Sequence, residues 1–404
     1  MPSPKKDEGP PADLNVGVIN PYALAEAELG SSVDWEAVDA REVLQETLDT
    51  PYERLFDPKF GSPLYAGLEY DPKTQDMVKR GVPDVIVGEG IQQVSEGATD
   101  ADTLETDASR EPESRDISDI LAGVAAGAAW VDKGTFFKEG SEFSDPVQGA
   151  VGDCYLIAAL SSVAWARTYD IAHRTRATGL SQQQFVDQVT FFEGAKKILV
   201  EVTETVPVNS AGNFLYARSS EAGEIWPAVY EKAYAKWRLG TPGDHPNILG
   251  IAGGDPILAA AQLTGLSRNY YATKSTSADT LWTRVRENAI SRKTFNPMVA
   301  WTYSSGEKSP DKVNYSSANL VANHAYSVLG WDYRSGAKYI VLRNPWGQTE
   351  ASKDLLSGTF TAWDAPYYGG PGWWRSVSLA ANDGTFGLRI ETFKKYFAYL
   401  AVVK

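Results

Sequence analysis

The stretch Gln148-Gly-Ala-Val-Gly-Asp-Cys154-Tyr-Leu-Ile-Ala-Ala decides the fold, because it joins a flexible segment directly to an apolar run. The run Cys154–Arg167 is rich in alanine and predicts a buried helix that begins at the cysteine. A thiol in the first turn of a helix lies at the positive end of the helix dipole, which lowers its pKa and favours the thiolate. Gly149 and Gly152 permit tight backbone geometry there. A lone cysteine is also commonly a small buried apolar residue, so this stretch leaves both interpretations open.

Two β-rich runs near the end of the chain are separated by Tyr-Arg-Ser-Gly-Ala, which predicts a hairpin. The runs are Ala325–Asp332 and Lys338–Arg343. If the turn centres near Arg334 and Ser335, antiparallel pairing places His324, just before the first run, almost opposite the residues that follow the second. The hairpin therefore predicts which groups the histidine meets.

His324 then faces Asn344 or Pro345. An asparagine beside a catalytic histidine can accept the Nδ1–H bond of the imidazole and fix a useful tautomer. Trp346 would shield this bond from water and so strengthen it. Gln148 would supply an amide donor for an oxyanion. Each also has an ordinary interpretation: a structural histidine, an Asn-Pro turn, a core tryptophan and a loop glutamine.

The composition restricts the class of protein. The chain has 404 residues, a formal net charge of −14, one cysteine and three histidines. The negative charge argues against a nucleic-acid partner. One cysteine excludes an internal disulfide and suits a reducing compartment, and the histidine spacing fits no zinc site. No apolar run approaches the roughly 18 residues that span a bilayer, and the first residues lack a secretory apolar stretch, so we expect a cytoplasmic protein.

Charge and periodicity divide the chain into regions. Nine acidic residues and two arginines between Glu96 and Asp119 predict a solvated linker. We expect an N-terminal region over 1–95, this linker over 96–120, a helical lobe over 121–266 and a β-rich lobe over 267–404. The fold class is α+β.

Several local elements are expected within these regions. Residues 1–15 are predicted to be disordered, and residues 15–95 to form a small domain or a prosegment that blocks the cleft. Helices are predicted over Asp34–Leu48, Ile225–Trp237 and Asp255–Leu263, and a short strand over Val82–Val87.

Several motifs together resemble the protease core of calpains. Besides the cysteine stretch, they are Ile225-Trp-Pro-Ala-Val-Tyr-Glu-Lys-Ala-Tyr-Ala-Lys, His324-Ala-Tyr-Ser-Val, Leu342-Arg-Asn-Pro-Trp-Gly347, Asp383-Gly-Thr-Phe and Phe393-Lys-Lys-Tyr-Phe397. The similarity covers roughly residues 127–404, with the motifs in the family's order. It implies a papain-like fold of two lobes, the helical lobe carrying the cysteine and the β lobe carrying the histidine and asparagine.

The resemblance assigns roles to four residues: Cys154 as nucleophile, His324 as base, Asn344 as the orienting residue and Gln148 as oxyanion donor. Tyr155 stands where calpains commonly carry tryptophan, and we expect its ring to pack beside the site.

Two calcium sites are also implied by the resemblance, because oxygen ligands suit Ca²⁺. The first would use the carboxylates of Asp145 and Glu224 with the backbone carbonyls of Lys138 and Gly140. The second would use Glu350, Asp354 and Asp383, but Thr385 stands where a second glutamate is expected, which weakens this site. The sequence contains no EF-hand motif, and we expect no calpain-type C-terminal regulatory domain, so any calcium control would lie in the core.

These observations predict an intracellular cysteine endopeptidase that is activated by calcium, acts on proteins or peptides and is regulated by its N-terminal region. Two alternatives stay open. One is a papain-like amidase or transglutaminase-type acyltransferase, which an amine-incorporation assay separates. The other is a catalytically silent binding module that keeps the fold.

Overall fold

The computed structural model describes residues 14–23, 69–71, 76–78, 128–138, 140–181, 184–364 and 373–404. Most of the predicted disordered start, the helix at 34–48, the strand at 82–87 and the acidic linker at 96–120 lie outside these ranges and stay predictions. Among the described residues, no helix is long and apolar enough to cross a membrane.

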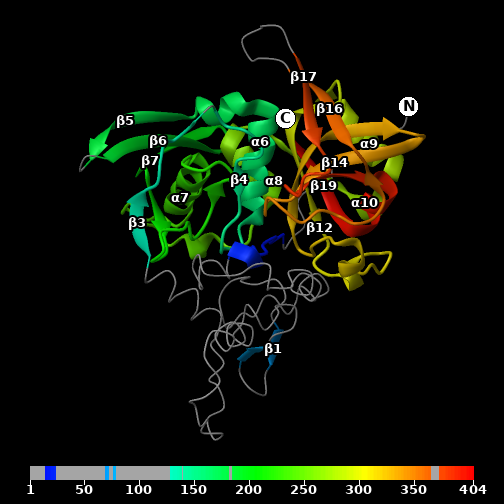
Figure 1. The fold of residues 1–404 in the computed structure, drawn as a ribbon, viewed down its shortest axis with the longest axis horizontal. Helices are drawn as coiled ribbons and strands as arrows, with labels where there is room; N and C mark the ends of the chain where they lie inside the picture. The colour runs from blue at the N-terminus through cyan, green and yellow to red at the C-terminus, as the bar shows by residue number, and fades with distance from the viewer. Residues whose placement is uncertain are drawn as a thin grey trace, which may run out of the picture.

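The described part of the chain combines helices with mainly antiparallel strands (Figure 1). The α-helices are α6 (Cys154–Ala172), α7 (Trp226–Arg238), α8 (Pro256–Thr264), α9 (Ala278–Glu287) and α10 (Ile390–Tyr396). Short 3₁₀ helices are η3 (Ile248–Ile251), η4 (Thr273–Ser275), η5 (Gly306–Lys308) and η6 (Ser316–Ala318).

The strands of the first half are β1 (Glu69–Asp71), β2 (Asp76–Val78), β3 (Ala129–Asp132), β4 (Pro146–Val147), β5 (Thr175–Ser181), β6 (Gln184–Glu193), β7 (Lys196–Thr203), β8 (Thr205–Val208) and β9 (Arg218–Ser219). Those of the second half are β10 (Arg268–Ala272), β11 (Ala289–Ile290), β12 (Lys293–Thr302), β13 (Ala325–Arg334), β14 (Ala337–Arg343), β15 (Leu355–Leu356), β16 (Thr359–Asp364), β17 (Trp373–Ser378), β18 (Thr385–Arg389) and β19 (Phe397–Val403).

The three helices predicted to start at Cys154, Ile225 and Asp255 are present as α6, α7 and α8, each within a few residues of its expected bounds. Helix α6 begins at Cys154, as predicted. Helix α8 begins where the Asp255 carboxylate accepts hydrogen bonds from the Ile257 and Leu258 backbone N–H groups, and it ends at Gly265 with a φ of 78°. A carboxylate cap at the start and a left-handed glycine at the end are the usual signals for helix boundaries.

Helix α6 connects the helical part of the molecule to the large sheet. This sheet has the order β10-β19-β12-β13-β14-β18-β15, with β11 paired to β12. Ser162 Oγ donates to Met298 O at 2.8 Å, and Trp165 Nε1 donates to Leu329 O at 2.6 Å. In Figure 1, α6 accordingly stands between the green elements and the orange-to-red sheet.

The first half is not purely helical, which corrects the expectation of a helical lobe followed by a β lobe. Strands β5, β6 and β7 form a three-stranded antiparallel sheet in that half. Its inner face is buried through Val189 and Phe191, whereas Leu180 and Leu199 are exposed. The alternation of buried and exposed residues along these strands is the ordinary signal of a sheet with one face in solvent, and the sequence prediction overlooked it.

Two large apolar clusters form the interior. One gathers side chains of α6, α7 and α8, and the other gathers side chains of the large sheet with α9 and α10. The residues Cys154 and Ala325 belong to the first cluster, and Tyr326 and Trp346 belong to the second. The predicted site residues therefore lie where the two clusters meet.

Candidate active site

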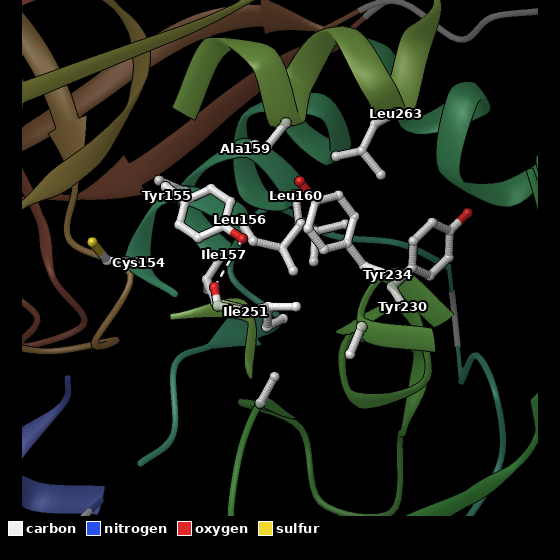
Figure 2. Packing of buried hydrophobic residues seen from close by; sticks show 14 of the residues in the cluster. Cys154, Tyr155, Leu156, Ile157, Ala159, Leu160, Tyr230, Tyr234, Ile251 and Leu263 are labelled. Atoms are coloured by element: carbon white, nitrogen blue, oxygen red, sulfur yellow. Dashed lines mark hydrogen bonds between the residues drawn. The ribbon is translucent and has the colours of Figure 1, made fainter. Parts of the chain in front are cut away.

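Cys154 occupies the first position of α6 and is fully buried. Burial raises the pKa of its thiol to about 12, while hydrogen bonds from the backbone of Ala325 and Val18 act in the opposite direction. The expected thiolate is therefore not favoured in this state, because loss of hydration outweighs the helix dipole. Figure 2 shows the sulfur pointing away from the apolar side chains behind Tyr155.

Tyr155 packs beside the site, as expected. Its hydroxyl donates to the Ile251 carbonyl at 2.9 Å, and its ring lies edge-on to Tyr234 (Figure 2). The same ring fills the space next to Gly254, where an added Cβ would lie 2.7 Å from it. Tyr155 thereby supports the backbone of the loop before α8.

The predicted hairpin forms, with its turn at Ser335 and Gly336 and a register shift between Val328 and Gly330. His324 immediately precedes β13, and Asn344 immediately follows β14. His324 Nε2 lies 2.8 Å from Asn344 Oδ1. The pairing of these residues is as predicted, but the ring nitrogen is Nε2 and not the expected Nδ1.

Because an amide oxygen can only accept, this contact requires the Nε2–H tautomer, which leaves Nδ1 with its lone pair. Nδ1 is buried and has no hydrogen-bond partner among the described residues. Burial lowers the pKa of His324 to about 3, opposed by the Asn344 bond. The imidazole is thus neutral and presents a free basic nitrogen.

Asn344 is itself held in place. Its Oδ1 also accepts from the Trp346 backbone N–H at 3.1 Å, and its Nδ2 donates to Thr349 O at 3.0 Å. The Trp346 side chain is buried, and its ring centroid lies 4.9 Å from that of His324. As the sequence predicts, Trp346 keeps water from the His–Asn bond.

Gln148 lies in the loop ahead of Cys154 and is almost fully buried. Its side-chain Nε2 donates to Val18 O at 2.6 Å and to Val151 O at 2.7 Å, and its backbone N–H donates to Pro345 O at 2.9 Å. In this structure the amide of Gln148 is thus occupied by two backbone carbonyls, one of them from Val18, whose backbone also contacts the thiol.

Residues 14–23 cover this site, a feature that sequence reasoning did not resolve to individual residues. Val18 is fully buried against the second apolar cluster, and Val16 against the first. The covering segment explains why both Cys154 and His324 lack exposure to solvent.

Two buried acids next to the thiol were also missed. Asp153 precedes Cys154, and Glu231 lies in α7; the two buried carboxyl groups lie close enough to affect each other's pKa. Burial raises the pKa of Asp153 to about 7 and that of Glu231 well above its ordinary range, to which the Asp153 charge adds. Burial therefore favours the protonated, neutral form of these carboxyl groups, because two charges this close together in the interior would repel each other. The signal in the sequence was an acid in the middle of an otherwise buried helix.

Three of the four residues expected at the first calcium site, Asp145, Glu224 and Lys138, lie close together. Burial raises the pKa of Asp145 to about 7, and the charge of nearby Glu224 raises it further. Glu224 Oε1 accepts from the Lys138 backbone N–H at 3.0 Å, so Lys138 lies at the same place. Gly140 has a φ of 148° and no atom within 4 Å of an added Cβ. Two buried carboxylates that repel each other next to a loop backbone fit a hard cation.

The residues expected at the second site come together only in part. The Asp383 backbone N–H donates to Glu350 Oε1 at 3.3 Å, and burial followed by the Asp383 charge raises the pKa of Glu350 to about 7. The Asp354 carboxylate instead accepts from the Thr392 hydroxyl. Thr385, in the position of the expected glutamate, donates its backbone N–H to Asp383 Oδ1. Within the described ranges, no three His, Cys, Asp or Glu side chains form a group able to hold a metal ion.

Comparison with known proteins agrees with this geometry. The profile of the calpain family cysteine proteases matches residues 127–404, so the chain belongs to that family and is of the cysteine peptidase class. The chain is 26% identical to a thiol protease of Porphyromonas gingivalis, over 95% of this chain and 87% of that protein. It is 26% identical to mouse calpain-9 and 27% identical to the chicken calpain-1 catalytic subunit, over 66% and 67% of this chain but only 37% of each relative.

Proposed function

We propose that this protein is an endopeptidase that hydrolyses peptide bonds through a thioester on Cys154. The observation that carries the proposal is the 2.8 Å contact of His324 Nε2 with Asn344 Oδ1, which leaves Nδ1 as a free base. The backbone of the next residue, Ala325, hydrogen-bonds the only thiol in the sequence. Family membership and the thiol protease relative support it.

The chemistry follows from the roles of these groups. His324 Nδ1 accepts the Cys154 proton, and the thiolate attacks the substrate carbonyl carbon. The Gln148 amide and the Cys154 backbone N–H, which has no partner within its own helix, stabilise the oxyanion. His324 then gives the proton to the leaving amine as the C–N bond breaks, and water hydrolyses the thioester to restore the thiol.

Calcium activation is a finer part of the proposal. Asp145 and Glu224, with the Lys138 and Gly140 carbonyls, would hold the cation, and Glu350 with Asp383 would form a weaker second site. A bound Ca²⁺ would neutralise the carboxylate repulsion and fix the loop that leads to Gln148.

Regulation by the N-terminal region and a cytoplasmic location complete the proposal. The first is supported by the contacts of residues 14–23 with the site, and the second only by the sequence. The division into lobes at residues 121–266 and 267–404 also belongs to the proposal.

The test is cleavage of casein or a general fluorogenic peptide across a Ca²⁺ titration in the presence of reductant, with the Cys154→Ala protein alongside. Cleavage that depends on Cys154 supports the proposal. Incorporation of an amine into a glutamine substrate without hydrolysis would indicate the acyltransferase alternative. No reaction of Cys154 with an electrophilic peptide in any condition would favour the binding module.

A further inference from the structure

The segment that covers the site lies in it as a peptide strand. Val16 N donates to Gly254 O at 2.8 Å, and Gly254 N donates to Val16 O at 3.0 Å. This reciprocal antiparallel pair is the way an extended peptide docks onto an exposed backbone edge. Gly253 N in turn donates to Gly152 O at 2.8 Å, which fixes this edge to the loop that carries Cys154.

Gly17 passes through the narrowest part of the site. A Cβ at this residue would lie 2.5 Å from Gly152 O and 2.7 Å from Gly253 Cα, so no larger residue fits without displacement of backbone. The Gly17 carbonyl accepts from Asn323 Nδ2 at 3.4 Å. The segment thus passes between the loop before Cys154 and the loop before His324.

Val18 meets the reacting groups themselves. Its carbonyl oxygen accepts from Gln148 Nε2 at 2.6 Å, and its backbone N–H bonds to the Cys154 sulfur. The peptide bond whose nitrogen faces the sulfur therefore joins Gly17 to Val18, and its oxygen points to Asn323. Gln148 holds the next carbonyl along the chain.

The segment continues on the far side of the thiol. Asn20 Nδ2 donates to Gln148 O at 2.8 Å, and the Tyr22 ring lies edge-on to Trp346 at 6.5 Å. The described contacts thus span the site from Gly254 to Trp346.

From these contacts we propose that residues 14–23 are an intramolecular pseudo-substrate. They occupy the cleft as a peptide would, but Gln148 binds a carbonyl one residue beyond the bond that faces the thiol, so the segment is held without being cleaved. This inference depends on the proposed peptidase function only where it treats the cleft as a substrate-binding cleft. That residues 14–23 cover Cys154 does not depend on that function. The cleft therefore accepts an extended peptide that places a glycine at the narrowest point of the cleft.

The single cysteine allows a direct test in the full-length protein, because all thiol labelling reports Cys154. In Gly17→Val, the added side chain displaces the segment, and we expect iodoacetamide to alkylate Cys154 about tenfold faster or more, as a small shift toward an open state produces. Gly243→Val is the matched control, since Gly243 is exposed with no atom within 4 Å of an added Cβ. Asn20→Ala, which loses the bond to Gln148 O, is a milder second variant and should accelerate alkylation in the same direction.

A synthetic peptide Leu-Asn-Val-Gly-Val-Ile-Asn-Pro-Tyr-Ala, added to the Gly17→Val protein, should slow alkylation again, and the same peptide with valine in place of its glycine should not. Alkylation as slow in Gly17→Val and Asn20→Ala as in wild type, with circular dichroism unchanged, would overturn the inference. Faster alkylation without peptide cleavage would keep the pseudo-substrate and refute the peptidase. Peptide cleavage with unchanged alkylation of Cys154 would support the peptidase and overturn the pseudo-substrate.

Discussion

Asn344 Oδ1 lies 2.8 Å from His324 Nε2 and also accepts from the Trp346 backbone N–H, so one amide oxygen joins the imidazole to the turn after β14. Because this oxygen cannot donate, it fixes the tautomer that leaves Nδ1 basic.

Asn344→Ala should therefore lower kcat more than it changes KM. Loss of one buried hydrogen bond of about 1–3 kcal/mol corresponds to a fall in kcat of about fivefold to 150-fold. Steady-state kinetics on a fluorogenic peptide measure the effect, with circular dichroism as the check on folding. An unchanged kcat in a folded variant would show that Asn344 does not orient the base.

Gln148→Ala should change two quantities in opposite directions. Turnover should fall by about 10²–10³, the usual loss for one oxyanion donor. Alkylation of Cys154 should become faster, because Gln148 also holds the Val18 carbonyl of the covering segment. If turnover and alkylation both stay at wild-type values, Gln148 has neither role.

The buried pair Asp153 and Glu231 predicts a pH-dependent stability. Both pKa values are raised by burial, that of Asp153 to about 7, so the folded protein keeps a proton that the unfolded chain releases above about pH 4. The stabilisation is complete below that pH and is lost as pH rises through about 7. The melting temperature in EDTA should therefore fall from pH 5 to pH 8 by less in Glu231→Gln than in wild type.

The comparison of wild type with Glu231→Gln is needed because His324 makes stability fall toward low pH, whereas the acid pair makes it fall toward high pH. Its pKa is lowered to about 3, so protonation of the unfolded chain destabilises the protein as pH falls below about 6.5. This contribution is common to wild type and Glu231→Gln and cancels in the difference. Glu307→Gln, at an exposed side chain, should melt like wild type at both pH values. Identical pH dependence of wild type and Glu231→Gln would rule out a proton retained by this pair.

Calcium binding should raise the melting temperature through Asp145 and Glu224. A ligand that binds only the folded protein stabilises it by about 2.7 kcal/mol at a hundredfold excess over its dissociation constant. Asp145→Asn and Glu224→Gln should lose most of the Ca²⁺-induced shift, whereas Asp354→Asn should keep it, since that carboxylate is turned to Thr392. An equal shift in all four proteins would place the cation elsewhere.

The sequence predicts those features that local pattern controls. The start of α6 at Cys154 follows from an apolar run after glycines, and the approach of Asn344 to His324 follows from the hairpin between them. The hairpin turns at Ser335 and Gly336, one residue later than predicted, and its register shifts between Val328 and Gly330. The paired residues therefore differ from the prediction, yet the Asn344 side chain still reaches the imidazole.

Contacts between segments far apart in the chain could not be predicted from local sequence patterns. The Gln148–Val18 bond spans 130 residues, and no periodicity in either segment reports it. The proximity of Asp153 to Glu231 could not be predicted either, because an acidic residue in a helix, such as Glu231, is ordinarily expected to face solvent. The nitrogen that meets Asn344 also depends on the ring orientation, which packing against Trp346 sets.

The measurement that tests the central claim most directly is casein cleavage by Gly17→Val and by Gly17→Val/Cys154→Ala, each with and without Ca²⁺. We expect cleavage by the first protein, faster than by wild type, and none by the second. Equal cleavage by both, or none by the first while its Cys154 is freely alkylated, would contradict the assignment of Cys154 as the nucleophile of a peptidase.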